Sequence, residues 1–113
     1  MNSMTLREIC IKTGVGRRAI QGYEKAGLVG PSGKNKYGYL LYDENAVERI
    51  EEIFFLQQIG FPVKEIALII DSSDKTKRVA LERQLEVLRR NSERLAHLIL
   101  KTEETLESLK TKV

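Results

Sequence analysis

Residues 13–28 decide the fold, and they read TGVGRRAIQGYEKAGL. A short turn at Gly14 leads into a helical run from Arg17 to Ala26, which stops at the next glycine. Ile20 and Tyr23 lie three residues apart in this run and therefore share one helical face. The pattern predicts a short helix with an inner, packed face and an outer face open to a partner.

Another helix is expected directly before the turn. Thr5 and Glu8 form a capping-box pattern, in which a hydroxyl caps the helix and a carboxylate three residues later returns a hydrogen bond. Leu6, Ile9 and Cys10 then fall on one helical face. Two helices of about two to three turns, joined by so short a turn, predict a helix-turn-helix.

The chain changes character at residues 28–42. A Gly-Pro-Ser-Gly turn and the later Gly38 interrupt a stretch that is rich in Tyr and Leu. We expect a small β-hairpin with its tip near residues 34–36 and a return strand over residues 39–42. A hairpin next to a helix-turn-helix is typical of winged DNA-binding domains, in which the hairpin is called the wing.

Two further helices complete the predicted head. Asp43 caps the first of them, whose expected inward residues are Val47, Ile50 and Phe54, with Ile53 and Gln57 as further candidates. The second begins at Phe61-Pro62 and is expected to bury Val63, Ile66, Ala67 and Ile70. The three phenylalanines, Phe54, Phe55 and Phe61, indicate packing rather than a ligand site.

After a polar break at residues 71–74, the remaining chain contains no Gly or Pro and is predicted to form one long helix. Its apolar residues keep a heptad repeat if Ser92 and Thr102 occupy two polar positions of the same seam. The apolar positions are Leu81, Leu85, Leu88, Leu95, Ile99, Leu106, Leu109 and Val113. Because a small head cannot bury so long a stripe, a second copy of the chain is the simplest partner. Ser92 and Thr102 either set the register or strand orientation, or are tolerated weak positions.

The expected fold class is mainly α: a winged helix-turn-helix head with a β-hairpin wing over residues 1–71, then a coiled-coil dimerisation helix over residues 72–113. The apolar runs are too short to span a membrane and no secretion signal is evident, so a cytoplasmic location is expected. Cys10 and His97 are the only residues of their kinds and fall in different elements. We therefore expect no metal, no cofactor and no enzymatic activity.

Charge is unevenly distributed along the chain, although its net value is only +3. Residues 1–40 carry seven basic and two acidic side chains, a net charge of +5, whereas residues 41–70 carry two basic and six acidic ones, a net charge of −4. A basic head suggests a polyanionic partner. Charge alone fits a solvated surface with chance clustering equally well.

Helix-turn-helix geometry nominates candidate DNA contacts. The second helix enters the major groove with its N-terminal residues, here Arg17, Arg18 and Gln21. Arginine can bind guanine or phosphate through two parallel hydrogen bonds, and glutamine can bind adenine in the same way. The wing candidates, which can hold phosphate oxygens, are Lys34, Lys36, Tyr37 and Tyr39. On spacing alone, the same surface also fits contacts with a protein.

Three motifs, in order, resemble the MerR family of bacterial transcription regulators. Residues 13–28 are similar to its Thr-Gly-Val turn, arginine, Tyr-Glu pair and Gly-Leu close. Residues 38–42 resemble its Gly-Tyr-Arg-x-Tyr wing motif, and residues 59–66 resemble the sequence that opens its fourth helix. The resemblance implies a homodimer with an antiparallel coiled coil, bound to a near-palindromic promoter operator in double-stranded DNA, with RNA polymerase as a further partner.

The resemblance also assigns roles to single residues. Arg18 matches the family's recognition-helix arginine, Lys34 its basic wing residue, and Tyr39 its wing tyrosine that contacts the phosphate backbone. The chain departs from the family where Gln21 and Gly22 replace an arginine and an aromatic residue, and where Leu40 replaces a wing arginine.

Two functions remain open from the sequence. One is a DNA-binding regulator with an altered operator preference, and the other is an interaction adaptor that keeps the fold but has weakened or lost DNA binding. Family members usually carry a sensor after the coil, whereas this sequence ends with the coil. Either a sensor segment is missing, or signals arrive through a partner protein or a pocket, so a small-molecule effector stays unidentified.

Overall fold

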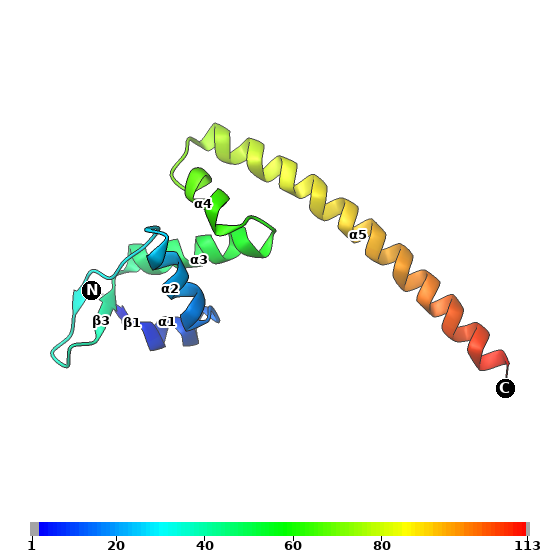
Figure 1. Ribbon diagram of the computed structural model, residues 1–113, viewed down its shortest axis with the longest axis horizontal. Helices are drawn as coiled ribbons and strands as arrows, with labels where there is room; N and C mark the ends of the chain where they lie inside the picture. Colours follow the sequence, from blue (N-terminus) through cyan, green and yellow to red (C-terminus); the bar gives the residue numbers. More distant parts are fainter. Residues whose placement is uncertain (1–2, 113) are drawn as a thin grey trace. The chain divides into compact units, whose positions relative to one another are not determined.

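The computed structural model describes residues 3–112. Its elements, in chain order, are β1 (Met4–Thr5), α1 (Leu6–Thr13), α2 (Arg17–Lys25), β2 (Gly33–Lys34), β3 (Leu40–Tyr42), α3 (Glu44–Gln58), α4 (Val63–Ile69) and α5 (Asp74–Thr111) (Figure 1). The chain divides into two compact units between Ser73 and Asp74. The first unit, from β1 to α4, is called the head below, and α5 makes up the second. The predicted fold class, mainly helical with a small wing and a long C-terminal helix, is confirmed.

The predicted capping box opens α1. The Thr5 hydroxyl accepts a hydrogen bond from the Glu8 N–H (3.3 Å), and the Glu8 carboxylate accepts one from the Thr5 N–H (3.0 Å). The bonds from the Thr5 backbone and hydroxyl lower the pKa of Glu8. At its other end, α1 stops at Gly14, whose φ of 76° lies in the left-handed region that favours glycine.

The turn between α1 and α2 is held by one side chain. The Thr13 hydroxyl donates to the Ile9 carbonyl (2.7 Å) and accepts from the Val15 N–H (3.1 Å). Val15 itself is buried, so the turn is fixed both by hydrogen bonds and by packing. This turn sets where α2 begins relative to α1.

A three-stranded antiparallel sheet forms the base of the wing, in the order β1-β3-β2. The paired residues are Met4–Tyr42 and Thr5–Leu41 on one side of β3, and Gly33–Leu41 and Lys34–Leu40 on the other. The hairpin of β2 and β3 is the predicted one. Strand β1 was not predicted, because two residues are too few to show an alternating pattern.

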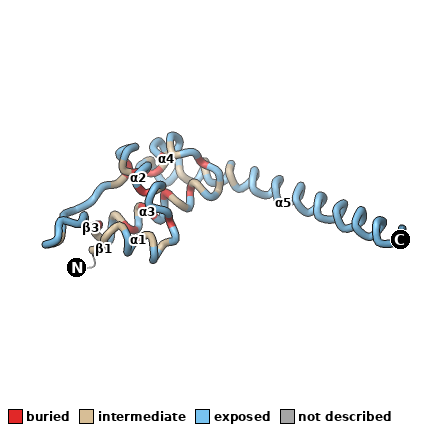
Figure 2. The backbone as a smooth tube through the Cα atoms, turned by 60° about the horizontal axis from the view of Figure 1, so that its bottom comes forward, coloured by how far each residue is buried: buried red, intermediate tan, exposed pale blue. Residues whose placement is uncertain are grey.

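The buried residues that form the core of the head come from α1, α2, α3, α4, strand β3 and the turns between them, and Figure 2 colours them red along the backbone. Its largest fully buried members are Ile9, Val15, Ile20, Tyr23, Tyr42, Ile50, Ile53 and Ile66. Burial of such side chains stabilises a fold by about 1.5–3 kcal/mol each. The core therefore fixes the orientation of α2 without using its outer face.

Two buried tyrosines tie α2 to its neighbours through their hydroxyls. The Tyr23 hydroxyl donates to the side-chain oxygen of Gln57 on α3 (2.5 Å), and the Tyr42 hydroxyl donates to the carboxylate of Glu24. Burial, together with the Glu24 carboxylate, raises the pKa of Tyr42. The second bond links strand β3 of the wing directly to α2.

The buried faces of α3 and α4 differ in part from those predicted. Leu56 is buried, whereas Phe54 is only partly so and Phe55 is exposed. The reason is that α3 contacts α2, β3 and α4, so its buried face turns along the helix. In α4, Ile66 is buried as predicted, but Ala67 is exposed, because this short helix packs mainly against α3 alone.

Helix α5 runs without interruption, as predicted. Its seam side chains are 37–59% exposed: Leu81, Leu85, Leu88, Leu95, Ile99, Leu106 and Leu109. The last predicted seam residue, Val113, lies outside the described residues. Between residues 3 and 112, no helix combines the length and the apolar composition needed to cross a membrane.

Candidate nucleic-acid interface

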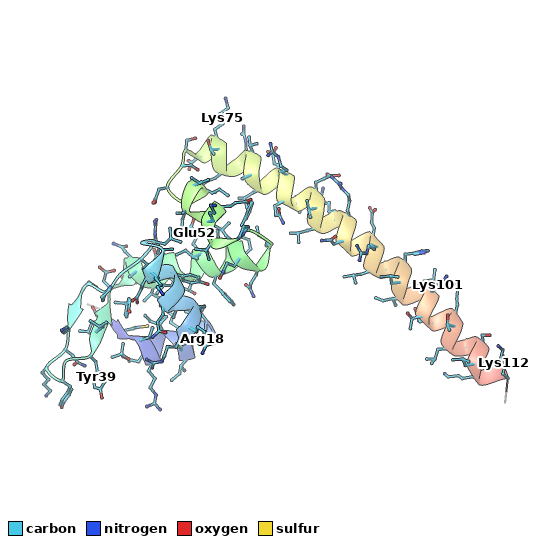
Figure 3. All side chains as sticks on the ribbon, in the orientation of Figure 1. Arg18, Tyr39, Glu52, Lys75, Lys101 and Lys112 are labelled. Carbon is cyan, nitrogen blue, oxygen red and sulfur yellow. The ribbon has the colours of Figure 1, made fainter. Side chains whose placement is uncertain are left out.

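Helix α2 presents the three predicted contact residues on its outer side. Ile20 has no exposed surface and Tyr23 has almost none, so these two side chains anchor the helix in the core. Arg17, Arg18 and Gln21 are all exposed. Figure 3 labels Arg18. The helix thus offers a polar, basic face that carries none of the packing.

The N-terminal turn of α2 is positive in more than one way. Its N-cap is Gly16, which has no side chain to bond the free N–H groups, and its first turn holds no acidic residue. Arg17 and Arg18 add two guanidinium groups to the positive end of the helix dipole. This placement costs the isolated helix up to about 1 kcal/mol per charge and is favourable once an anion binds.

The tip of the wing is a tight loop organised by Asn35. Its side-chain oxygen accepts hydrogen bonds from the N–H groups of Tyr37 (2.9 Å) and Tyr39 (3.1 Å), and its carbonyl accepts one from the Gly38 N–H (3.0 Å). Gly38 has a φ of 84°, which strains any residue with a side chain. The loop is therefore held in shape by its own residues.

The wing candidates are displayed on this loop and on β2. Lys36 places its ammonium 5.1 Å from the centroid of the Tyr37 ring, a cation–π contact, and Lys34 is exposed on β2. Tyr39 is 66% exposed. It lies one residue before β3 rather than in the predicted return strand, because the Asn35 side chain binds its N–H.

A groove of about 630 Å³ separates the wing from the N-terminal ends of α1 and α2. Its lining residues are Thr5, Leu6, Arg7, Arg17, Gly38, Tyr39 and Leu40. Of the residues nominated from the sequence, the groove brings together Arg17 of α2 and Tyr39 of the wing. The others lie outside its lining: Arg18, Gln21, Lys34, Lys36 and Tyr37.

Arg7 is a groove residue that sequence reasoning did not nominate. It is exposed in the first turn of α1 and lines the groove together with Arg17 of α2. Neither guanidinium forms an ion pair with a carboxylate of residues 3–112. The available signal was a basic residue at the start of a helix, where the dipole favours an acidic one.

The described part of the chain contains no cluster of side chains that could bind a metal ion. No three potential ligand side chains come together among residues 3–112. Cys10 is a partly buried free thiol on α1, and His97 is exposed on α5. These two residues contribute nothing to the groove.

The head as a whole corresponds to one known family. A family model described as MerR HTH family regulatory protein matches residues 4–73, which run from β1 through α4. The chain belongs to the MerR family. This match confirms the prediction of MerR family membership that was drawn from residues 13–28, 38–42 and 59–66.

Individual MerR relatives extend the likeness into α5. The chain is 30% identical to the HTH-type transcriptional activator mta of Bacillus subtilis over 104 residues, covering 92% of this chain and 40% of that protein. The crystal structure of MtaN, the N-terminus of the Bacillus subtilis multidrug transporter activator, matches with a TM-score of 0.67 and 29% identity, covering 91% of this chain and 97% of that one. The chain spans about two fifths of the length of the curated activators that it matches. These relatives are named as transcriptional regulators, not as enzymes.

A third comparison shows the shared fold alone. HiNmlR, a MerR family regulator lacking the sensor domain and solved bound to promoter DNA, matches with a TM-score of 0.70 at 20% identity. The match covers 87% of this chain and 79% of that chain.

Three departures from the MerR motifs lie on the surface. Gln21 and Gly22 are exposed on α2, and Leu40 is 41% exposed where it lines the groove. None of the three contributes to the buried core of the head. Gln21 and Gly22 alter the exposed surface of α2, and Leu40 alters the lining of the groove, while the MerR fold is kept.

Proposed function

We propose that this MerR-family chain is a sequence-specific DNA-binding transcription regulator that acts as a homodimer on a near-palindromic promoter operator. The observation that carries the proposal is the outer face of α2. Its basic N-terminal turn is exposed, and it borders a groove whose other wall is the wing. A major groove accepts a helix of this kind, and the adjacent phosphates are within reach of a wing.

The proposed roles divide the exposed residues into two groups. Arg18 and Gln21 face outward near the start of α2 and contact base edges. Backbone phosphates are held by Arg17, Lys34, Lys36, Tyr37 and Tyr39. The second group fixes the position of the head, and the first discriminates between sequences.

The proposed dimer pairs α5 with α5 of a second copy as an antiparallel coiled coil. Residues 1–71 would bind DNA and residues 72–113 would dimerise. The exposed apolar seam of α5 supports this division, since a stripe of leucines left in water is unfavourable. A two-fold dimer requires half-sites separated by about one helical turn or a multiple of it.

The proposed wider setting is the one typical of MerR-family regulators. A regulator of this kind works in the cytoplasm and acts on RNA polymerase at the promoter, and the names of the relatives support a role in transcription. Any effector would act through a sensor segment, a partner protein or a pocket. No small molecule is assigned.

The direct test is selection of bound fragments from random duplex DNA, followed by footprinting and gel shifts over a range of salt concentrations. We expect an inverted repeat. With about six phosphates neutralised, affinity should fall by about 10³-fold between 50 and 200 mM salt. Recovery of no enriched sequence at any salt concentration would contradict the proposal.

Arg18 provides the matched mutational test. We expect Arg18→Ala to abolish operator binding in gel shifts while sedimentation still shows a dimer, because the residue faces outward and carries no packing. The control is Lys25→Ala, which removes the same charge from the last turn of the same helix. Normal operator binding by the Arg18→Ala variant would show that Arg18 is not part of the DNA interface.

The second candidate function is a protein-interaction adaptor with weakened or lost DNA binding. One observation favours it: Leu40 places an exposed apolar side chain in the groove, at the position where the family's wing motif has an arginine. An adaptor would show no shift with promoter fragments at low or high salt. Salt-sensitive binding to an enriched sequence excludes it.

A further inference from the structure

We propose that two copies of α5 pair in one antiparallel register, with Ser92 of each copy opposite Thr102 of the other. This inference rests on the homodimer proposed above and adds the alignment of its helices. It is carried by the seam of α5, by the charges beside the seam, and by the hydroxyl groups within it.

The residues that flank the seam are the first part of the argument. One flank, formed by the residue after every second seam position, consists of Glu82, Arg89, Ala96, Glu103 and Lys110. Arg89, Glu103 and Lys110 make no ion pair within residues 3–112. Glu82 makes one exposed contact with Arg78, at 3.7 Å in the same helix. These charges are therefore available to a second helix.

The proposed register matches every charge on this flank. When one helix is reversed, its flank lies beside the same flank of the other copy. Placing position 92 opposite position 102 then pairs Glu82 with Lys110 and Arg89 with Glu103, each pair occurring twice in the dimer. Ala96 meets its own counterpart near the two-fold axis. Every charged residue on the flank thus faces the opposite charge.

The same register also matches the seam. Its apolar layers are Leu85 with Leu109, Leu88 with Leu106, and Leu95 with Ile99. On the other flank, Leu98 meets Leu98 of the second copy beside the axis and would bury a side chain that is 46% exposed in one chain. No layer sets a leucine against a hydroxyl.

The hydroxyls of the polar layer, formed by Ser92 and Thr102, have complementary hydrogen-bonding capacity. Thr102 donates its hydroxyl proton to the Leu98 carbonyl of its own helix (2.7 Å), which leaves the oxygen free to accept. The Ser92 hydroxyl has no partner within residues 3–112 and can donate. Ser92 of one copy can therefore bond to Thr102 of the other, and the polar layer is satisfied.

Shifting the pair by one heptad in either direction removes this agreement. One shift sets Glu82 against Glu103 and Ser92 against Leu95. The opposite shift sets Arg89 against Lys110 and Ser92 against Leu109. Like charges facing each other are destabilising, and each unmatched hydroxyl would be buried against a leucine or isoleucine side chain.

A parallel pair loses the same matches. In that arrangement Ser92 faces Ser92, Arg89 lies beside Gln84, and Glu103 lies beside Leu98. Neither the acidic nor the basic residue then meets its complement. Among these four alignments, the proposed register alone satisfies the charges, the apolar layers and the hydroxyls together.

Disulfide trapping in the full chain tests the register. In a Cys10→Ser background, which removes the native thiol, a tagged Ser92→Cys chain is refolded with an untagged chain carrying Thr102→Cys, Leu95→Cys or Leu109→Cys. Mild oxidation should cross-link Ser92→Cys to Thr102→Cys at least about tenfold faster than to either alternative, because bonding requires Cα atoms within about 7 Å.

Each other outcome is decisive. Trapping with Leu95→Cys or Leu109→Cys would overturn the register but keep the dimer. Self-trapping of Ser92→Cys alone would indicate a parallel pair. A wild-type chain that sediments as a monomer would instead overturn the homodimer of the proposed function. None of these measurements involves DNA, so a failure of the proposed register can be distinguished from a failure of the proposed DNA binding.

Charge reversal provides an independent measurement. We expect Arg89→Glu to raise the dimer dissociation constant about tenfold, since two attractive pairs become repulsive. Combining it with Glu103→Arg should restore the constant to within about threefold of wild type. Absence of this rescue, with both single variants folded, would overturn the register.

Discussion

Arg7 and Arg17 belong to different helices, yet both line the groove beneath the wing. Arg7 also lies in the first turn of α1, where a positive charge opposes the helix dipole. Leu40, in the same groove, stands where the family's wing motif has an arginine. Arg7 thus places a positive charge in the same groove as Leu40.

We expect Arg7→Ala to weaken binding to operator and to unrelated duplex by a similar factor, because a phosphate contact carries no sequence information. The slope of log affinity against log salt should become shallower by about one per head. Fluorescence anisotropy over a salt series measures both quantities. Lys12→Ala, at the other end of α1, is the control. An unchanged salt dependence in the Arg7 variant would mean that Arg7 does not contact a DNA phosphate.

Tyr42 gives a pH prediction at the same scale. Burial and the Glu24 carboxylate raise its pKa in the folded chain, whereas the unfolded chain titrates near 10. Its contribution to stability is therefore complete below pH 10 and is lost as the pH rises beyond that value. Tyr42→Phe should lower the free energy of unfolding by about 1 kcal/mol at neutral pH and flatten the decline above pH 10.

Urea unfolding at pH 7, 9 and 10.5 measures this effect. Tyr37→Phe is the control, since Tyr37 is exposed on the wing loop. If the stability of the Tyr42→Phe chain fell above pH 10 as steeply as that of the wild type, ionisation of Tyr42 would not be the cause of the decline.

Residue chemistry could be predicted where it depends on neighbours in the chain. Arg17 was nominated from its place at the start of the second helix and Tyr39 from its place near the tip of the hairpin, and both line one groove. Arg7 could not be nominated in the same way. Its importance depends on which side of α1 meets the wing, and that is decided by the pairing of β1 with β3.

At the scale of elements, α2 carries a glycine that its structure does not require. Gly22 lies within the helix, and an added Cβ would meet no atom within 4 Å. We expect Gly22→Ala to raise the free energy of unfolding by about 1 kcal/mol, because alanine loses less conformational freedom in a helix. Thermal and urea unfolding check the change.

Gly14 is the matched control for that substitution. Its surroundings are equally open, but its φ of 76° is left-handed. Gly14→Ala should therefore destabilise the chain by about 1–2 kcal/mol. Equal effects of the two substitutions would mean that backbone conformation does not govern either site.

Helices were predicted more fully than strands, for a physical reason. The capping box at Thr5 and the cap at Asp43 leave signatures within four residues, and both are present. Strand β1 is only two residues long and exists through its partner β3. Likewise, the exposure of Ala67 and the burial of Leu56 depend on where α3 and α4 meet, which periodicity does not encode.

For the whole molecule, the proposed coupling between dimerisation and operator binding can be tested with one leucine of the seam. Leu95→Glu places a charge in the proposed dimer contact, and we expect a monomer by sedimentation. Its head should still fold, since α5 contributes no buried residue. Operator affinity should fall by about 10²-fold or more, because two linked heads bind far more tightly than one.

Leu100 supplies the control for that experiment. The Leu100 side chain is 55% exposed, a fraction similar to the 58% of Leu95, but it lies outside the seam. Leu100→Glu should leave both the dimer and operator affinity near wild type. A Leu95→Glu chain that remains dimeric would place the contact elsewhere on α5.

Thr5 has two structural duties, since it pairs with Leu41 in the sheet and also caps α1. Shortening the chain to start at Leu6 would delete a strand and a helix cap in one step. A working head excised for study must therefore keep Met4 and Thr5, even though they precede the first helix.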